Sequence, residues 1–128
     1  MRIDRFLLTG APDPAFNVPI FDFASPGVAN RPNAAQALLI QPNGAIVAGG
    51  IASVALGVTN FGLARFNSEG RFDTAFGTGG IVTTQFFGRN DQIFALTRQP
   101  DGKLVAVGVT INPTTGTTAV ALARYFGN

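Results

Sequence analysis

QPNGAIVAGG at residues 41–50 returns as QPDGKLVAVG at residues 99–108, an offset of 58 positions. In both stretches Pro, then Asn or Asp, then Gly follow one apolar run and precede another. Pro presets the backbone angle φ of a turn, the Asn or Asp side chain caps the turn, and Gly accepts a positive φ. Each stretch therefore predicts the tight turn of a β-hairpin.

A second motif recurs with nearly the same spacing. It is RFNSEGRFDTAF at residues 65–76, and Arg124 begins it again near the C-terminus. An offset of 60 positions aligns it with the following residues near the N-terminus: Arg5, Phe6, Gly10, Asp13, Ala15 and Phe16. Two independent motifs in the same order and with a matching period are typical of a repeat protein. We therefore expect one repeat domain over 1–128, with a partly degenerate first unit at 1–64, a second at 65–123 and the start of a third at 124–128.

Alternating and apolar segments bounded by turn residues predict four short strands in each unit. The first strand is expected at 35–40 and 93–99, the second at 45–51 and 103–109, the third at 59–66 and 118–126, and the fourth at 81–86. A weaker fourth strand is expected at 18–23 in the first unit, where Asn17-Val18-Pro19 replaces a glycine-rich turn. No window has a sustained helical period.

Four short antiparallel strands cannot bury both faces of so small a sheet unless neighbouring sheets stack on them. The sequence therefore predicts an all-β fold made of β-propeller blades of four antiparallel strands, about two blades per chain. A parallel β-solenoid is the main structural alternative, although its coils are usually shorter and lack the hairpin signal.

Counting the expected strands along the chain suggests oligomerisation. Their order is three and four, then one to four, then one to three, so that both ends of the chain fall within a blade. Propellers typically close with about four to eight blades. We therefore expect a cyclic homo-oligomer, with a trimer favoured, in which residues 1–23 of one copy complete the blade at 92–126 of the next. A different partner protein is the alternative.

Three stretches closely resemble the delta-60 repeat. They are FGLARFNSEG at 61–70, FDTAFGTGGIVTT at 72–84, and AL at 95–96 with QPDGKLVAVG at 99–108. The resemblance implies a bacterial protein of the β-propeller type, often secreted or surface-associated and of undefined function. It departs at 17–33, where the first unit is degenerate.

Composition excludes several classes of site. Hydrophobic residues make up 46% of the chain and charged residues 12%, which is typical of a folded protein. The chain has no Cys and no His, which removes thiolate and histidine catalysis and any site that needs these metal ligands. Nine scattered basic residues and a net charge of +2 do not predict a nucleic-acid partner. The sequence contains no signal peptide and no membrane span, and its residues leave the compartment open.

Arginine and aspartate recur at matching positions of the second motif. Arg5, Arg65 and Arg124 alternate with apolar residues, and Asp13 and Asp73 stand near the turn that follows. We expect each Arg to pair with such an Asp and to brace the blade.

Four phenylalanines form two apolar clusters, namely Phe21 with Phe23 and Phe86 with Phe87. Packing within the blades is the favoured interpretation, and an exposed docking surface is the alternative.

No residue pattern predicts a catalytic, cofactor or metal site. A non-enzymatic binding or assembly module that acts through protein contacts is therefore the favoured function. An oligomeric carbohydrate-binding propeller is the alternative, although the chain has no Trp and one Tyr to form a sugar platform. A carboxylate-based hydrolase is the least favoured class, and it would depend on Asp22, Glu69 or Asp91.

Overall fold

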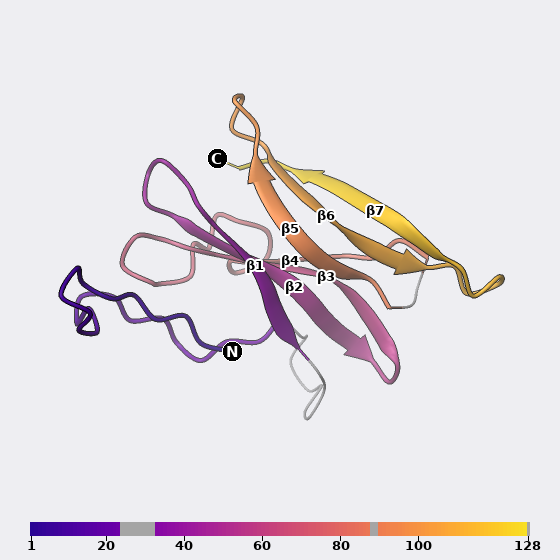
Figure 1. Ribbon diagram of the computed structural model, residues 1–128, viewed down its shortest axis with the longest axis horizontal. Helices are drawn as coiled ribbons and strands as arrows, with labels where there is room; N and C mark the ends of the chain where they lie inside the picture. Colours follow the sequence, from indigo (N-terminus) through magenta and orange to yellow (C-terminus); the bar gives the residue numbers. More distant parts are fainter. Residues whose placement is uncertain (24–32, 88–89, 128) are drawn as a thin grey trace.

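The computed structural model describes residues 1–23, 33–87 and 90–127, and this part of the chain contains strands and no helix (Figure 1). The strands are β1 (Ala34–Ile40), β2 (Ile46–Ala55), β3 (Val58–Phe66), β4 (Ile81–Thr84), β5 (Gln92–Arg98), β6 (Leu104–Ile111) and β7 (Thr118–Tyr125). They form a four-stranded sheet in the order β1-β2-β3-β4 and a three-stranded sheet in the order β5-β6-β7. All neighbouring strands are antiparallel, as predicted for two consecutive blades.

The two hairpin turns form where the sequence predicts them. The Gly44 amide donates to the Gln41 carbonyl at 2.9 Å, and the Gly102 amide donates to the Gln99 carbonyl at the same distance. The turns therefore set the same register in β1–β2 and in β5–β6, with Ile40 opposite Ile46 and Arg98 opposite Leu104.

Both sheets contain a β-bulge at the same place. The register shifts between Ala35 and Ala37 in β1, and the equivalent shift occurs in β5. At each bulge the first strand approaches a glycine of the second so closely that a Cβ on Gly50 would lie 1.8 Å from the Ala34 carbonyl oxygen. Gly108 has the same distance to the Gln92 carbonyl oxygen. Glycine is required at these two positions because any side chain would overlap the neighbouring backbone.

The fourth strands are less regular than predicted. β4 ends at Thr84, two residues before the expected end. Residues 18–23 form no regular strand, which corrects the expectation of a fourth strand in the first unit. Met1 and Phe21 do exchange backbone hydrogen bonds, but Pro19 has no N–H to extend a ladder.

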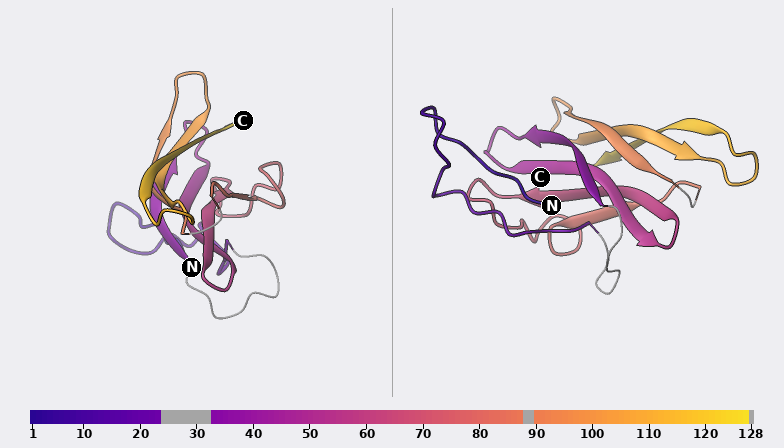
Figure 2. Two further views of the ribbon diagram at one scale, coloured as in Figure 1. Left: turned by 90° about the vertical axis from the view of Figure 1, so that its right-hand side faces the viewer. Right: turned by 60° about the horizontal axis from the view of Figure 1, so that its bottom comes forward.

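Three layers stack along the chain (Figure 2). The β1–β4 sheet lies in the middle, with residues 1–23 packed on one face and the β5–β7 sheet on the other. The first core cluster joins Phe16, Val18, Phe21 and Phe23 to residues of β2 and β3. The second joins Val47, Phe61, Leu63 and Phe76 to the inward residues Ile93, Leu104, Ala106 and Ala121. Alternation along each strand therefore gives the β1–β4 sheet one apolar face toward residues 1–23 and the other toward the β5–β7 sheet.

β7 occupies the third position of the β5–β7 sheet, next to β6. Residues 1–6 correspond to the same third position at the 60-residue offset. In the described chain, residues 1–23 instead cover the β1–β4 sheet of their own copy.

Candidate functional site

The β3–β4 connection holds Arg65 in a three-part arrangement. Its Nε lies 2.9 Å from Asp73 Oδ2, and its guanidinium carbon lies 4.6 Å from the centre of the Phe76 ring. The Asp73 amide bonds back to the Arg65 carbonyl at 2.9 Å, which fixes the distance between the two residues along the chain. The Arg65 side chain is 4% exposed, so the ion pair lies largely out of water.

Arg5 makes the same three contacts in the N-terminal segment. Its Nε donates to Asp13 Oδ2 at 2.8 Å, and its guanidinium carbon lies 4.6 Å from the centre of the Phe16 ring. Hydrogen bonds from the Ala15 amide and from the Arg5 side chain lower the pKa of Asp13 below its ordinary value. This copy is more open, because the Arg5 side chain is 41% exposed.

Each of these arginines also reaches the next layer. Arg5 Nη1 donates to the Ser68 carbonyl at 2.8 Å, and Arg65 Nη1 donates to the Gly127 carbonyl at 2.9 Å. The amide nitrogen of Gln41 donates to the same Gly127 oxygen at 2.8 Å. We call this arrangement the arginine clasp: an Arg that pairs with the Asp eight residues on, stacks on a Phe and holds a backbone carbonyl of the following layer. Charge-assisted hydrogen bonds of this kind are stronger than neutral ones.

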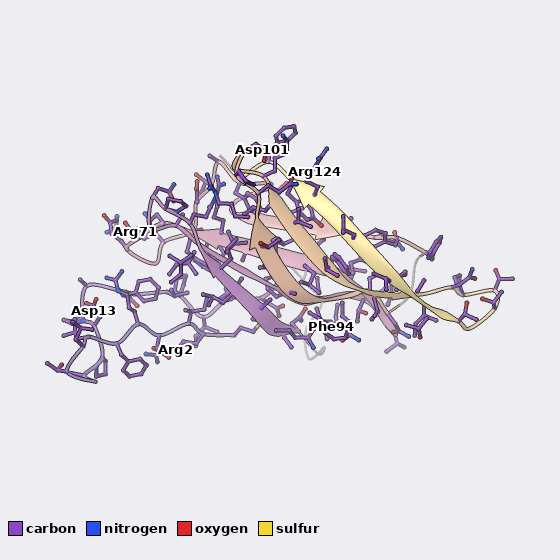
Figure 3. All side chains as sticks on the ribbon, turned by 45° about the horizontal axis from the view of Figure 1, so that its top comes forward. Arg2, Asp13, Arg71, Phe94, Asp101 and Arg124 are labelled. Atoms are coloured by element: carbon purple, nitrogen blue, oxygen red, sulfur yellow. The ribbon has the colours of Figure 1, made fainter. Side chains whose placement is uncertain are left out.

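Arg124 holds the corresponding position on β7, but its side chain has no hydrogen bond in the described part of the chain. It is exposed and lies at the same end of the β5–β7 sheet as Asp101 (Figure 3). The Lys103 side chain lowers the pKa of Asp101 by a hydrogen bond, and the charge of Arg124 adds to that effect. Of the five expected brace residues, the structure brings Arg5 to Asp13 and Arg65 to Asp73, while Arg124 stands apart from both aspartates.

The four phenylalanines of the candidate docking surface do not share one surface. Phe21 and Phe23 are 4% and 1% exposed and fill the first core cluster, so neither is available for docking. Phe86 packs against the second cluster, with its ring 4.9 Å from that of Phe61. Phe87 alone is substantially exposed, at 54%.

A face that the sequence did not single out is left uncovered by the described residues instead. Because Leu104, Ala106 and Ala121 point toward β1–β4, the alternate residues of the β5–β7 sheet point away from it. We call this side the outer face, and its central residues are Val105, Val107, Val109, Ile111, Val120 and Leu122. The alternation of apolar residues on both faces of β6 was the sequence signal for it, since a strand with only one buried face has polar residues on the other.

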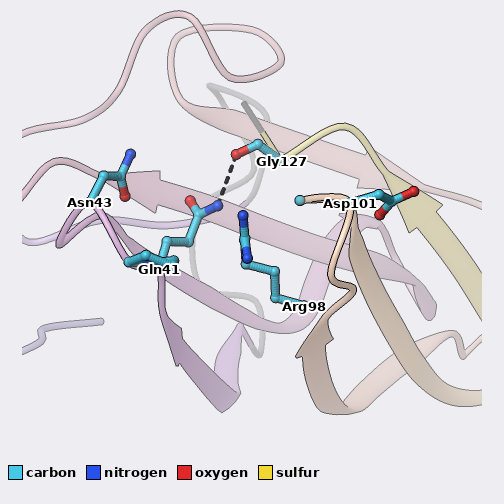
Figure 4. Close-up of a pocket in the computed structure, with 7 residues that line it drawn as sticks. Gln41, Asn43, Arg98, Asp101 and Gly127 are labelled. Carbon is cyan, nitrogen blue, oxygen red and sulfur yellow. Dashed lines mark hydrogen bonds between the residues drawn. The ribbon is translucent and has the colours of Figure 1, made fainter.

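A small polar pocket lies between the two hairpin turns (Figure 4). Its volume is about 260 Å³, and it is lined by Gln41, Pro42, Asn43, Arg98, Asp101, Gly102 and Gly127. Gln41 is 5% exposed and its side-chain oxygen is buried without a partner. The pocket therefore contains hydrogen-bond donors and acceptors, among them the guanidinium of Arg98 and the carboxylate of Asp101. That carboxylate already accepts a hydrogen bond from Lys103.

The three carboxylates considered for hydrolysis lie in different environments. Asp91 is fully buried and accepts a hydrogen bond from the Phe86 amide at 2.8 Å, whereas Asp22 and Glu69 are exposed. A buried, structurally engaged Asp91 has no access to a substrate. In the described ranges no group of three or more acidic residues is placed to hold a metal ion, and no helix there could cross a membrane.

Two consecutive antiparallel sheets with equivalent hairpin turns and β-bulges, packed face to face, are the arrangement of neighbouring β-propeller blades. The model of one family, described as a domain of unknown function (DUF5122) beta-propeller, matches residues 41–76 and 99–128, which together make up just over half of the chain. The chain belongs to this family. No curated protein and no solved structure matches it.

Proposed function

We propose that this chain is a non-enzymatic assembly module that binds a second copy of itself through the outer face of the β5–β7 sheet. The main support is a difference between equivalent positions of the two sheets. Phe61 and Leu63 on β3 are 0% exposed because the β5–β7 sheet covers them. Val120 and Leu122 hold the same positions on β7, and they are 79% and 58% exposed.

The chemistry of the outer face favours a protein partner. Its apolar residues continue across β6 and β7 in register, so they form one patch and not scattered single side chains. Contiguous exposed apolar patches of this kind mark interaction sites in soluble proteins. β7 also has one edge without a strand partner in the described chain, and such an edge favours association.

A second copy offers a matching apolar surface at its other end. Leu38 and Ile40 on β1 are 51% and 65% exposed, and Phe6 and Ile20 of the N-terminal segment are 61% and 86% exposed. Leu38 and Ile40 stand opposite Ala48 and Ile46, on the face of the β1–β4 sheet that also carries the first core cluster. Association would therefore be head to tail, with the outer face of one copy against the N-terminal layer of the next.

The number of copies depends on how residues 1–23 are used. Three copies follow if these residues complete the β5–β7 sheet of the neighbour, as the strand count predicts. Two copies follow if they remain a separate layer, because two chains of three layers then lie within the usual range of about four to eight blades. The occupation of the third position by β7 favours two copies.

We also propose the finer family assignment, the delta-60 repeat, and with it a bacterial protein that is secreted or surface-associated. The β-propeller description of the matched family and the recurrence of the clasp at the 60-residue offset support it.

Carbohydrate binding is the second candidate, and the polar pocket between the hairpin turns favours it. Arg98, Asp101 and Asn43 are side chains that commonly bind sugar hydroxyls, and head-to-tail copies would present several such pockets at once. The pocket has no aromatic residue on which a sugar ring could stack. A glycan array separates the two functions, because a lectin gives sugar-inhibitable binding and an assembly module gives none.

Substitutions on the outer face test the proposed function. Leu122→Lys places a charge in the middle of the patch and should abolish association. Leu56→Lys is the matched control, since Leu56 is 88% exposed in the β2–β3 hairpin and lies off the outer face. Circular dichroism checks that both variants fold. Equal association of the two variants would contradict the proposal.

A further inference from the structure

Two of the three equivalent arginines, Arg5 and Arg65, form complete arginine clasps, and the third, Arg124, does not. Arg5 and Arg65 reach carbonyls 63 and 62 residues further along the chain. The Arg124 side chain has no hydrogen-bond partner in the described ranges, so its clasp lacks the carbonyl of a following layer.

The acceptors form a matching series. Each of the two carbonyls that are held stands three residues after an arginine, because Ser68 follows Arg65 and Gly127 follows Arg124. The third carbonyl of this series belongs to Leu8, which follows Arg5 by the same three residues. Leu8 is fully exposed, and its carbonyl accepts no hydrogen bond within the described ranges.

The loop that carries Leu8 already has the geometry of the loop that carries Ser68. Leu7 N donates to Ala11 O at 2.8 Å, and Asn67 N donates to Arg71 O at 2.8 Å. An isolated bridge closes both loops, between Phe6 and Pro12 and between Phe66 and Phe72. The backbone that presents the Leu8 carbonyl therefore has the form of the backbone that presents a held carbonyl.

The second donor of the clasp, Gln41, also has an equivalent in the β5–β6 hairpin, namely Gln99. Gln41 donates to the Gly127 oxygen alongside Arg65. Gln99 holds the position of Gln41 at the 58-residue offset, and its side-chain oxygen is likewise buried without a partner. Arg124 and Gln99 thus repeat the pair of side chains that binds one carbonyl in the described structure.

We infer that Arg124 and Gln99 of one copy bind the backbone carbonyl of Leu8 in a second copy, which becomes the next layer of the stack. This inference rests on the proposed self-association and specifies its polar contact. It makes the contact directional, because one end of the chain has the free donors and the other end has the free acceptor. Residues 1–23 of the second copy then pack against the β5–β7 sheet of the first copy as a separate layer.

Arg124→Met tests the clasp, because it keeps an apolar stem of similar length and removes the donors. The loss of a hydrogen bond from a charged group should raise the Kd for self-association roughly ten- to a hundredfold. Arg124→Lys should give an intermediate Kd, since an ammonium retains a donor but loses the planar fork. Arg71→Met is the control, because Arg71 is exposed and lies far from Arg124 (Figure 3).

The outcomes separate the clasp from the proposed function. If the unsubstituted chain is monomeric at all concentrations, both fail. If it associates and Arg124→Met has the same Kd as Arg71→Met, the clasp is wrong and self-association stands.

Cross-linking locates the contact independently, since the chain has no Cys of its own. Cysteines introduced by Leu8→Cys and Phe126→Cys in one chain should be joined between copies by a short bismaleimide. The pair Leu8→Cys and Leu56→Cys should give no such product, and equal yields from the two pairs would overturn the placement.

Discussion

Arg65 donates to the carbonyl of Gly127 at 2.9 Å and thereby joins the end of β3 to the end of the next sheet. The same arginine pairs with Asp73 and stacks on Phe76, so a single side chain stabilises both its own blade and the contact between blades. A single sheet of three or four short strands cannot bury its two apolar faces without neighbouring layers. Contacts between layers therefore account for much of the stability of this fold.

The buried clasp should matter more than the exposed one. Arg65→Met leaves Asp73 without its partner and the Gly127 carbonyl with one donor fewer, so we expect the free energy of unfolding to fall by about 2–3 kcal/mol. Arg5→Met should cost clearly less, because its side chain is far more exposed and its ion pair is screened by water. Urea denaturation of both variants measures the difference, and equal losses would count against the importance of burial.

Phe23 should be essential to the first core cluster. Its ring lies directly over Gly62, where an added Cβ would be 2.7 Å from the Phe23 ring, so Phe23→Ala leaves a cavity against bare backbone. We expect a loss of about 3–5 kcal/mol of unfolding free energy. Phe87→Ala is the control, and it should change stability by no more than about 0.5 kcal/mol, because Phe87 is exposed. A small effect of Phe23→Ala would show that residues 1–23 do not pack on the β1–β4 sheet.

Tyr125 reports on the contact between β7 and β4. Burial raises the pKa of its phenol. The hydrogen bond between its hydroxyl and Thr84 Oγ1, at 2.8 Å, partly offsets that rise, because the Thr84 hydroxyl can donate to the phenolate. The chain has one Tyr and no Trp, so tyrosinate absorbance follows this residue alone. Thr84→Val should raise the pKa further. The pKa of Tyr125 is higher in the folded protein than in the unfolded chain. The stability that the Tyr125 phenol contributes is therefore present below the unfolded pKa and is lost as pH rises through the folded pKa. A Tyr125 pKa at or below its ordinary value would contradict this.

Asp13 should titrate below the ordinary range of an aspartate. The Ala15 amide and the Arg5 side chain both bind its carboxylate and lower its pKa. Arg5→Gln should therefore raise the pKa only part of the way, because the Ala15 hydrogen bond stays. The stability that this group contributes is present above the unfolded pKa and is lost as pH falls through the folded pKa. Carboxyl NMR titration measures the Asp13 pKa in the unsubstituted chain and in Arg5→Gln. The same pKa in both would exclude a role for the ion pair.

Local sequence signals predicted the parts of the fold that depend on neighbouring residues. The turns at Gly44 and Gly102 form where Pro, Asn or Asp, and Gly stand between apolar runs, because turn chemistry is set within four residues. The ion pairs of Arg5 and Arg65 span eight residues each, and alternation along one strand is enough to suggest them.

The parts that depend on distant backbone were not predictable in the same way. Every residue has a backbone carbonyl, so nothing in the sequence marks those of Ser68 and Gly127 as acceptors. The hydrogen bonds from Arg5 and Arg65 to the next layer could therefore be identified only in the structure. The fourth strand at 18–23 was expected from its apolar residues, but Pro19 breaks the ladder and the segment is held by aromatic packing instead. The outer face was missed because covered and uncovered blade faces have the same apolar alternation.

The solution mass of the unsubstituted chain, measured by light scattering over a range of concentrations, tests the central claim most directly. Head-to-tail stacking of separate layers predicts a folded dimer, with about twice the chain mass of 13.3 kDa. Completion of the neighbour's sheet by residues 1–23 predicts a trimer, with about three times the chain mass. A folded chain that stays at 13.3 kDa at every concentration would contradict self-association through the outer face.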